Sequence, residues 1–161
     1  MSIDLSIIIV NYNTKDLLIA CIDSILRVNP KLEYEIIVVD NASSDGSQDV
    51  LAKLVSKKLR LIQHKSNLGF AKANNTGIKK ALGKYIFLLN SDTLVKRGTL
   101  ETLVEFAKKN LSVGLAAPQL FNLDGTVQPS VFRFPTIGRA IRQYWFGEKG
   151  ILDKHYPSSN K

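Results

Sequence analysis

Residues 5–40 read LSIIIVNYNTKDLLIACIDSILRVNPKLEYEIIVVD, and this stretch decides the fold class. Leu5–Val10 is a short, β-branched apolar run that Ile36–Val39 repeats, as strands buried on both faces of a parallel sheet do. Between these runs, apolar residues recur at helical spacing after Thr14, which suits a helix N-cap, and stop before Pro30. The stretch therefore predicts a strand–helix–strand unit.

The same alternation continues along the chain. We expect helices near residues 47–56, 71–82 and 99–109, strands at 59–63 and 85–89, and a further strand or extended segment at 114–120. Strands that alternate with helices of these lengths predict an α/β fold with a three-layer, mostly parallel sheet and right-handed crossovers.

The pattern changes after residue 120. Asn122–Thr126 contains the Asp-Gly pair of a tight turn, which predicts a hairpin between Phe121 and Val127. Beyond it, prolines, arginines and aromatic residues replace the α/β rhythm. We therefore expect one main domain over residues 1–127 and a different segment over 128–161, with a frayed, disordered end.

Composition and charge narrow the class of protein. The net charge of +8 fits nucleic acid, anionic lipid or a phosphorylated small ligand equally well. Many lysines occur in pairs at expected helix ends or loops, where a solvated surface is the ordinary interpretation, so we expect no nucleic-acid partner.

The single cysteine and the apolar runs bear on location. Cys21 lies in an apolar helical pattern, so neither a disulfide framework nor a cysteine zinc site is expected, and a cytoplasmic setting follows. We see no basic, apolar export signal, and no apolar run approaches the ~18 residues that a membrane span needs.

Polar residues follow three of the expected strands, where ligands bind in open parallel sheets. Ser43, Ser44 and Asp45 need no explanation beyond turns and helix caps. Asp40 and Asp92 each follow a run that should be buried, and a carboxylate there needs a partner to offset its desolvation, which favours a ligand or cation. The polar residues at the three strand ends are Asn11, Tyr12 and Asn13, then Asp40 and Asn41, then Asn90, Ser91 and Asp92.

Two common phosphate-binding motifs are excluded by inspection. No glycines have the G-x-G-x-x-G spacing, and Gly83-Lys84 lacks the earlier glycine of a Walker loop. A diphosphate would then be held through a divalent cation on a strand-end carboxylate, and Asp92 fits that description.

The chain resembles the family 2 glycosyltransferases, which have the GT-A, Rossmann-like nucleotide-diphospho-sugar transferase fold, and in particular the rhamnosyltransferase-like branch. The likeness covers about residues 5–95 closely and continues more weakly through 118–120 and 125–136. Four segments in register carry it: Ser6–Asn13 (SIIIVNYN), Glu35–Ser47 (EIIVVDNASSDGS), Asn67–Gly77 (NLGFAKANNTG) and Tyr85–Asp92 (YIFLLNSD).

The resemblance implies an inverting enzyme that moves a sugar from a UDP- or dTDP-sugar to a saccharide or lipid-linked acceptor in polysaccharide biosynthesis. Tyr12 would stack on the base, with Asn11 and Asn13 shaping its pocket, and Asp40 would accept a hydrogen bond from the imide N–H of the base. Asp92 would hold Mg²⁺ or Mn²⁺ against both phosphates.

Six further residues of the matching segments are assigned to the donor site by the resemblance. Lys72 either reaches a phosphate or faces solvent, and Asn74 and Asn75 either line the donor site or bond within their helix. Many relatives have an aspartate two residues before the metal-binding aspartate, where this chain has Asn90. Fewer negatively charged protein groups would therefore hold the cation. The six are Asn67, Lys72, Asn74, Asn75, Asn90 and Ser91.

The general base that an inverting transferase needs is not identified. In the family it comes from a later segment, and the chain is expected to stop before it. The catalytic residue is therefore unknown, because none of the later acidic residues is a credible base: Glu101, Glu105, Asp124, Glu148 and Asp153.

Three alternatives stay open. The chain is a transferase, a non-catalytic nucleotide-sugar-binding module or remnant, or one half of a split enzyme whose partner chain supplies the base. Arg133–Phe146 either covers part of the sheet as a partial acceptor region or contacts a membrane surface, which would make the protein peripheral at the inner face of the membrane.

Overall fold

The computed structural model describes residues 2–132, 136–147 and 154–155. Contacts between residues divide the chain into two units, residues 1–114 and 115–161. The division lies earlier than the domain boundary expected after residue 127. Each unit is described separately.

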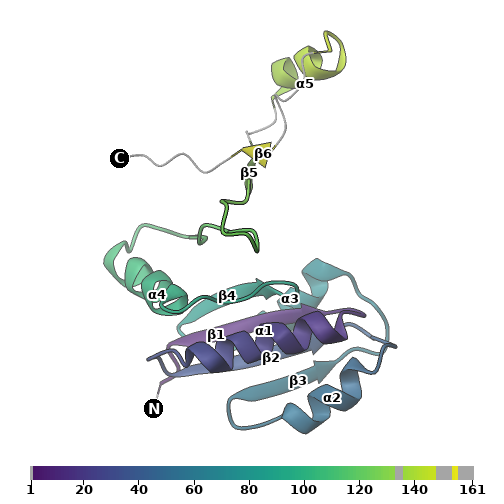
Figure 1. Cartoon of the computed structure of the whole chain (residues 1–161), viewed down its shortest axis with the longest axis vertical. Coiled ribbons are helices and arrows are strands. Elements are labelled where there is room, and N and C mark those ends of the chain that lie inside the picture. Colours follow the sequence, from purple (N-terminus) through teal and green to yellow (C-terminus); the bar gives the residue numbers. More distant parts are fainter. Residues whose placement is uncertain (1, 133–135, 148–153, 156–161) are drawn as a thin grey trace. The chain divides into compact units, whose positions relative to one another are not determined.

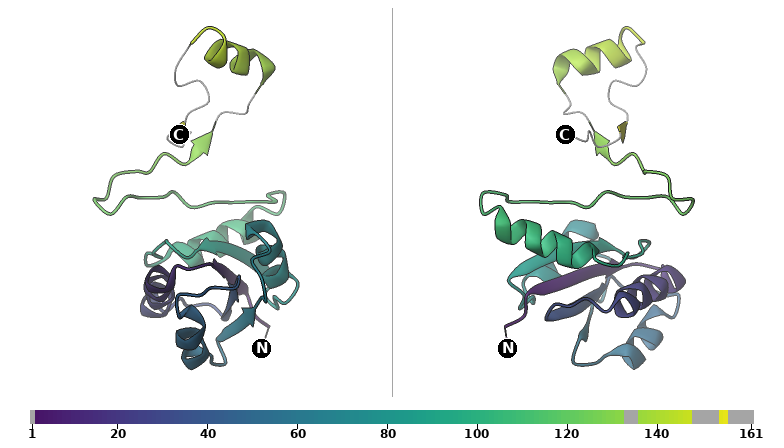
Figure 2. Two further views of the ribbon diagram at one scale, coloured as in Figure 1. Left: turned by 90° about the vertical axis from the view of Figure 1, so that its right-hand side faces the viewer. Right: turned by 60° about the vertical axis from the view of Figure 1, so that its left-hand side comes forward.

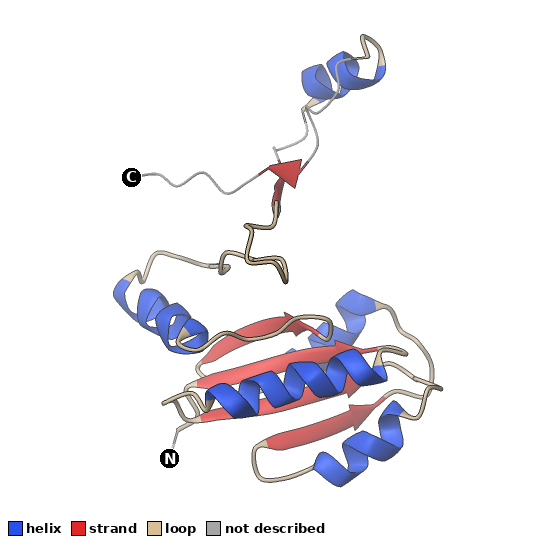
Figure 3. Cartoon of the chain, viewed as in Figure 1, coloured by secondary structure: helices blue, strands red, loops and turns tan. Residues whose placement is uncertain are grey.

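The first unit is built on a four-stranded sheet (Figure 3). All neighbouring strands pair in parallel. Leu5 lies opposite both Tyr34 and Tyr85, so three strands begin level, and the fourth begins opposite Ile36. The order is β3-β2-β1-β4, with bounds Leu5–Asn11 for β1, Tyr34–Asp40 for β2, Leu59–Gln63 for β3 and Tyr85–Asn90 for β4.

Helices cover both faces of this sheet, which confirms the expected three-layer α/β architecture (Figures 1 and 2). The chain steps from β1 to β2 to β3 in one direction, so right-handed crossovers place α1 (Lys15–Val28) and α2 (Ser47–Leu54) on the same face. The return from β3 to β4 reverses direction and places α3 (Phe70–Ile78) on the other face. The next helix, α4 (Thr99–Lys109), packs on the α1 side.

Two apolar clusters hold the layers together. The larger joins Ile7 and Ile36 of the sheet to α1, α2 and α4, and the smaller joins Ile8 and Val39 to α3. Alternate residues of one strand thus serve opposite clusters, because successive side chains of a strand point to opposite faces. Helix α3 lies so close to the sheet that a Cβ on Gly77 would come 2.5 Å from Cγ2 of Ile8.

A buried carboxylate fastens the amino-terminal edge of the sheet. Glu35 is only 2% exposed, and its oxygens accept hydrogen bonds from Ser6 Oγ (2.7 Å), the Leu82 amide (2.7 Å) and an Arg60 guanidinium nitrogen (2.8 Å). Ser6 Oγ accepts in turn from the Gly83 amide at 2.8 Å. Burial opposes ionisation of Glu35, but these hydrogen bonds and the Arg60 charge hold its pKa below the ordinary value.

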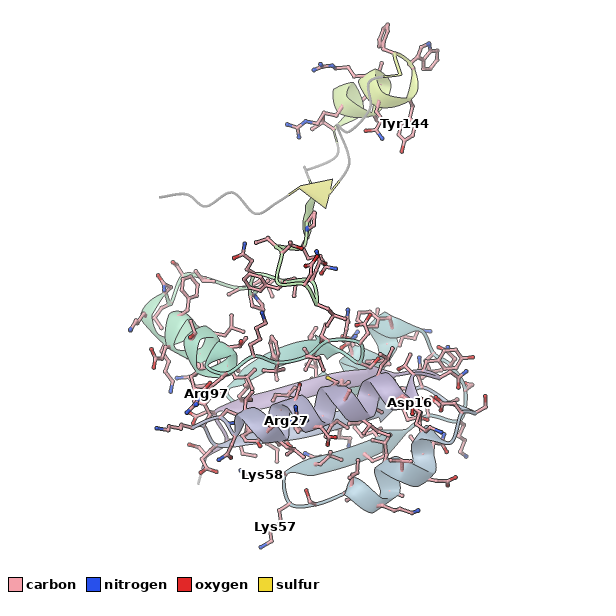
Figure 4. All side chains as sticks on the ribbon, viewed as in Figure 1. Asp16, Arg27, Lys57, Lys58, Arg97 and Tyr144 are labelled. Atoms are coloured by element: carbon pink, nitrogen blue, oxygen red, sulfur yellow. The ribbon has the colours of Figure 1, made fainter. Side chains whose placement is uncertain are left out.

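The ends of two helices differ from the expected ones. Helix α2 ends at Leu54 and α3 at Ile78, two and four residues earlier than the sequence indicates. The lysine pairs are solvent-exposed as expected, with Lys57 and Lys58 in the loop before β3 (Figure 4).

Residues 114–120, expected to form a strand or an extended segment, form neither a strand nor a helix. Pro118 cannot donate a ladder hydrogen bond, and the segment lacks the run of β-branched residues that marks β1 and β2. The hairpin that follows is confirmed: Phe121 and Val127 form an antiparallel bridge, and the Asn122 amide donates to the Thr126 carbonyl at 2.8 Å.

The described residues in the rest of the second unit form two short strands and one helix. Strand β5 (Val131–Phe132) pairs antiparallel with β6 (Lys154–His155), and α5 (Ile137–Tyr144) lies between them in sequence. Thr136 Oγ1 caps α5 by accepting from the Arg139 amide. Across the described ranges, no helix has the length and apolarity to cross a membrane.

Candidate donor-binding site

The carboxyl ends of β1, β2 and β4 meet at one edge of the sheet, as the sequence predicts. Asn11 lies opposite Asp40, and Val10 opposite Asn90. Because the strand order reverses beside β1, the topological switch point of the sheet falls between β1 and β4, where open α/β sheets bind ligands. Asp16, in the first turn of α1, lies at this edge (Figure 4).

Asp40 is completely buried at this edge and already has protein partners. One carboxylate oxygen accepts from Asn11 Nδ2 (2.9 Å), and the other accepts from the Ser43 amide (3.1 Å) and Gln48 Nε2 (2.7 Å). These three donors offset the desolvation that the sequence associates with this carboxylate. Its hydrogen bond with a base stays a prediction.

A second chain of hydrogen bonds crosses the switch point. Thr14 Oγ1 donates to Asn11 Oδ1 (2.7 Å) and lies 2.9 Å from Ser91 Oγ. Since the Thr14 proton is engaged by Asn11, the hydroxyl of Ser91 donates to Thr14. Thr14 is the N-cap residue of α1, as the sequence predicts, but its side chain makes no bond to the helix and instead joins the ends of β1 and β4.

Tyr12 and Asn13 stand at the solvent side of this network. The Tyr12 side chain is 48% exposed, as a residue that stacks on a base must be. Asn13 has a left-handed φ of 54°, its amide donates to Ser43 Oγ at 3.0 Å, and its Oδ1 accepts from the Ser44 amide at 2.7 Å. The loop after β2 therefore fixes the backbone beside Tyr12.

Asp45 ties together the starts of two helices. Its carboxylate accepts from the Lys15 amide of α1 (2.8 Å) and from the Ser47 amide of α2 (3.0 Å), and also bonds the Ser47 hydroxyl. The Ser47 hydroxyl is the main cause of the lowered pKa of Asp45. This confirms the interpretation of Asp45 as turn and cap chemistry.

A separate cluster organises the loop that leads into α3. Asn41 is buried, its Nδ2 donates to Asn67 Oδ1 (2.7 Å), and its Oδ1 accepts from the Leu68 amide (3.0 Å) and lies 3.0 Å from His64 Nδ1. Asn67 Oδ1 also accepts from the Gly69 amide at 2.9 Å. Sequence reasoning missed His64, although it follows directly on β3, the one strand end that was not considered.

The three candidates on α3 have different surroundings. Lys72 and Asn75 are exposed, whereas Asn74 is 5% exposed and donates from Nδ2 to the Phe70 carbonyl at 3.0 Å. The Asn74 amide thus bonds within the helix, and its contact with a donor stays a prediction.

The end of β4 turns sharply and presents a free carboxylate. The Thr93 amide and hydroxyl both donate to the Asn90 carbonyl, at 3.3 and 2.6 Å. Ser91 is buried, whereas Asn90 and Asp92 are exposed. Among the described residues Asp92 has no hydrogen bond or ion pair, and they contain no group of three or more His, Cys, Asp or Glu side chains that could hold a metal.

The buried Cys21 thiol lies behind this turn, 3.6 Å from the Asn90 carbonyl oxygen. Burial, together with the negative charge of Asp92, raises its pKa to about 12, against a weaker opposing hydrogen bond from Thr93. The thiol is thus protonated at neutral pH and serves packing, as its apolar helical pattern indicates.

The later acidic residues are engaged elsewhere. Glu101 and Glu105 lie on α4, where Glu101 accepts from the Lys31 amide (3.0 Å) and Glu105 pairs with Lys109 (3.9 Å). Asp124 bonds Thr126 within the hairpin turn. The two remaining candidates, Glu148 and Asp153, lie outside the described residues.

The sequence is similar to those of known glycosyltransferases. The chain is 38% identical over 112 residues to the poly(ribitol-phosphate) beta-glucosyltransferase of Bacillus spizizenii, covering 67% of this chain and 18% of that protein. It is 34% identical over 107 residues to glycosyltransferase GlyG of Streptococcus pneumoniae, covering 65% of this chain and 35% of that protein. The chain thus spans about a third or less of these relatives.

Among solved structures, the TarS 1-349 protein of S. aureus superposes with a TM-score of 0.61 at 26% identity, over 72% of this chain and 38% of that one. The likeness confirms the expected GT-A fold. The family model described as glycosyl transferase family 2 matches residues 6–156. The chain therefore belongs to glycosyl transferase family 2.

Proposed function

We propose that the chain forms the donor-binding part of an inverting glycosyltransferase that moves a sugar from a UDP- or dTDP-sugar to a saccharide or lipid-linked acceptor. One observation carries the proposal: Tyr12 and Asp92, both exposed, flank the switch point between β1 and β4, and the Thr14–Ser91 bond joins the two strand ends. TarS 1-349 has been solved with UDP and with UDP-GlcNAc, which supports a nucleotide-sugar donor here.

The base would lie on the Tyr12 ring. A carboxylate offers about four acceptor positions, and protein donors occupy three on Asp40. Because Asp40 is completely buried, a neighbouring group must move before the imide N–H of uracil or thymine can take the fourth. This acceptor favours those two bases over rings that do not donate at that position. Asn11 and Asn13 fix the backbone that shapes the pocket.

Asp92 fits the role of a single protein ligand for Mg²⁺ or Mn²⁺. Its exposed carboxylate follows a strand end, and hard cations take oxygen ligands from carboxylates, phosphates and water. When bound, such a cation neutralises charge that builds on the diphosphate leaving group. Asn90 and Ser91 add neutral oxygens nearby, and Asn67, Lys72 and Asn75 are the proposed contacts from the α3 side.

A thermal-shift panel tests this proposal. UDP or dTDP at about 100 times its Kd, with Mn²⁺ or Mg²⁺, should stabilise the folded chain by about 2.7 kcal/mol. Asp92→Ala should abolish the metal-dependent part, while Asp23→Ala, which removes an exposed aspartate of α1, should leave it intact. Absence of any shift with every nucleotide diphosphate would refute the donor site.

Turnover distinguishes a transferase from a binding module. Transfer or donor hydrolysis by the chain alone would exclude a non-catalytic remnant. Binding without turnover would favour the remnant, and turnover that appears only with a co-purifying polypeptide would favour a split enzyme whose partner supplies the general base.

Helix α5 supports a contact with the membrane surface, with the protein cytoplasmic and peripheral at the inner face. Ile137, Ile141 and Tyr144 recur at helical spacing and are 82%, 43% and 78% exposed, with Trp145 following (Figure 4). Such an apolar and aromatic face suits the interface of a bilayer. Co-sedimentation with anionic vesicles at low salt should fall in Ile137→Asp, and no binding by the unaltered chain would exclude this contact.

A further inference from the structure

We infer that His64 is a positioning residue for the donor site: its Nδ1–H, through Asn41, holds the Asn67–Gly69 loop in the conformation that receives the nucleotide. The inference rests on the proposed function. His64 is half-buried at the end of β3, 3.0 Å from Asn41 Oδ1 on one side and 3.2 Å from Thr76 Oγ1 on the other.

The hydrogen-bond network assigns the proton on Nδ1. Asn41 Nδ2 donates to Asn67 Oδ1, so the atom of Asn41 that faces His64 is its carbonyl oxygen, which accepts only. That oxygen also accepts from the Leu68 amide. His64 must therefore donate from Nδ1, whether or not Nε2 also carries a proton.

The two ring nitrogens connect elements that are otherwise distant in sequence. Through Nδ1 the ring reaches the residue after β2, and through Nε2 it reaches Thr76 of α3, whose hydroxyl also lies 3.0 Å from the Lys72 carbonyl. The His64 amide is itself fixed, because it donates to the Asp40 carbonyl at 2.9 Å. The imidazole is thus held rigidly while it orients Asn41.

The loop has little else to hold it. Asn67, Leu68 and Gly69 are all exposed, and the described hydrogen bonds of the Leu68 and Gly69 amides end on the side-chain oxygens of Asn41 and Asn67. Gly69 has a φ of 82°, which places the start of α3 directly after this turn. Losing the Nδ1–H donor should therefore free the loop without disturbing the sheet core.

The test compares His64→Ala with His64→Asn, which restores a donor at the δ position, and with Ile62→Val, which trims a partly buried side chain on the same strand but leaves the loop network intact. UDP affinity is measured by calorimetry with Mn²⁺, at a temperature where all variants are folded. Amide hydrogen exchange reports on Leu68 and Gly69, with the Ile8 amide as reference.

We expect His64→Ala to weaken UDP binding about tenfold, the scale of one lost hydrogen bond, and to speed exchange at Leu68 and Gly69 but not at Ile8. His64→Asn should recover most of the affinity, and Ile62→Val should retain it. Equal UDP affinity in His64→Ala and the unaltered chain would overturn the inference, as would an equal loss in Ile62→Val. If the unaltered chain binds no UDP, the proposed function itself fails.

Discussion

Replacing Glu35 with glutamine should cost the domain about 3 kcal/mol of its free energy of unfolding at pH 7. The glutamine oxygen can keep the bonds from Ser6 and the Leu82 amide, each 2.7 Å in the native structure, but without the charge. Charged acceptors contribute about 1 kcal/mol more per bond than neutral ones. The new amide group faces the Arg60 donor, and because the Arg60 side chain is 38% exposed, its pair with Glu35 is worth only about 1 kcal/mol.

The loss should also depend on pH. Because the pKa of Glu35 is lowered in the folded state, its ionised form stabilises the fold above the unfolded pKa of about 4.3. That stabilisation disappears as pH falls through the lower folded pKa. The difference between the two proteins should therefore shrink progressively below about pH 4.

Urea unfolding followed by far-UV circular dichroism at pH 7 and at several acidic pH values measures both effects. Glu33→Gln is the matched control, since this neighbouring side chain is exposed and should change stability by less than about 0.5 kcal/mol. A loss below about 1 kcal/mol for Glu35→Gln, or one that stays constant with pH, would refute the stabilising role of the buried Glu35 carboxylate.

Three further predictions concern the close packing of Gly77, the helix capping by Asp45 and the burial of Cys21. Gly77→Ala should lower the unfolding free energy by about 1–3 kcal/mol in the same urea experiment, since its Cβ would meet Ile8 at 2.5 Å; full stability would contradict the close approach of α3. Asp45→Ala should cost about 1–2 kcal/mol because two helices lose a cap, and an unchanged melting temperature would argue against that role. The Cys21 thiol, with a pKa of about 12, should react with iodoacetamide at pH 8 only after unfolding, and rapid labelling of the native chain would contradict its burial.

The sheet was predictable because apolar β-branched runs make parallel strands visible in sequence. Leu5–Val10 and Ile36–Val39 lie within β1 and β2, and their polar successors do converge at one edge. For residues 114–120 the sequence left a strand or an extended segment open, because it does not identify a pairing partner, and no strand forms there.

The hydrogen bonds that connect the residues of the site could not be predicted from the sequence. The bond of Asn11 to Asp40 and that of Glu35 to Ser6 each join residues 29 positions apart, which no local pattern reveals. His64 was missed for the same reason, because its partners Asn41 and Thr76 become neighbours only when β2, β3 and α3 are assembled.

The central claim is that a nucleotide sugar binds at the carboxyl edge of the sheet. Titrating the ¹⁵N-labelled chain with UDP and Mg²⁺ tests it most directly, because each amide reports on its own position. We expect shifts at the Asn13, Leu68 and Asp92 amides, with the Ser6 and Gly83 amides at the opposite edge unchanged. Shifts confined to the Ser6–Gly83 edge, or none at saturating UDP, would contradict it.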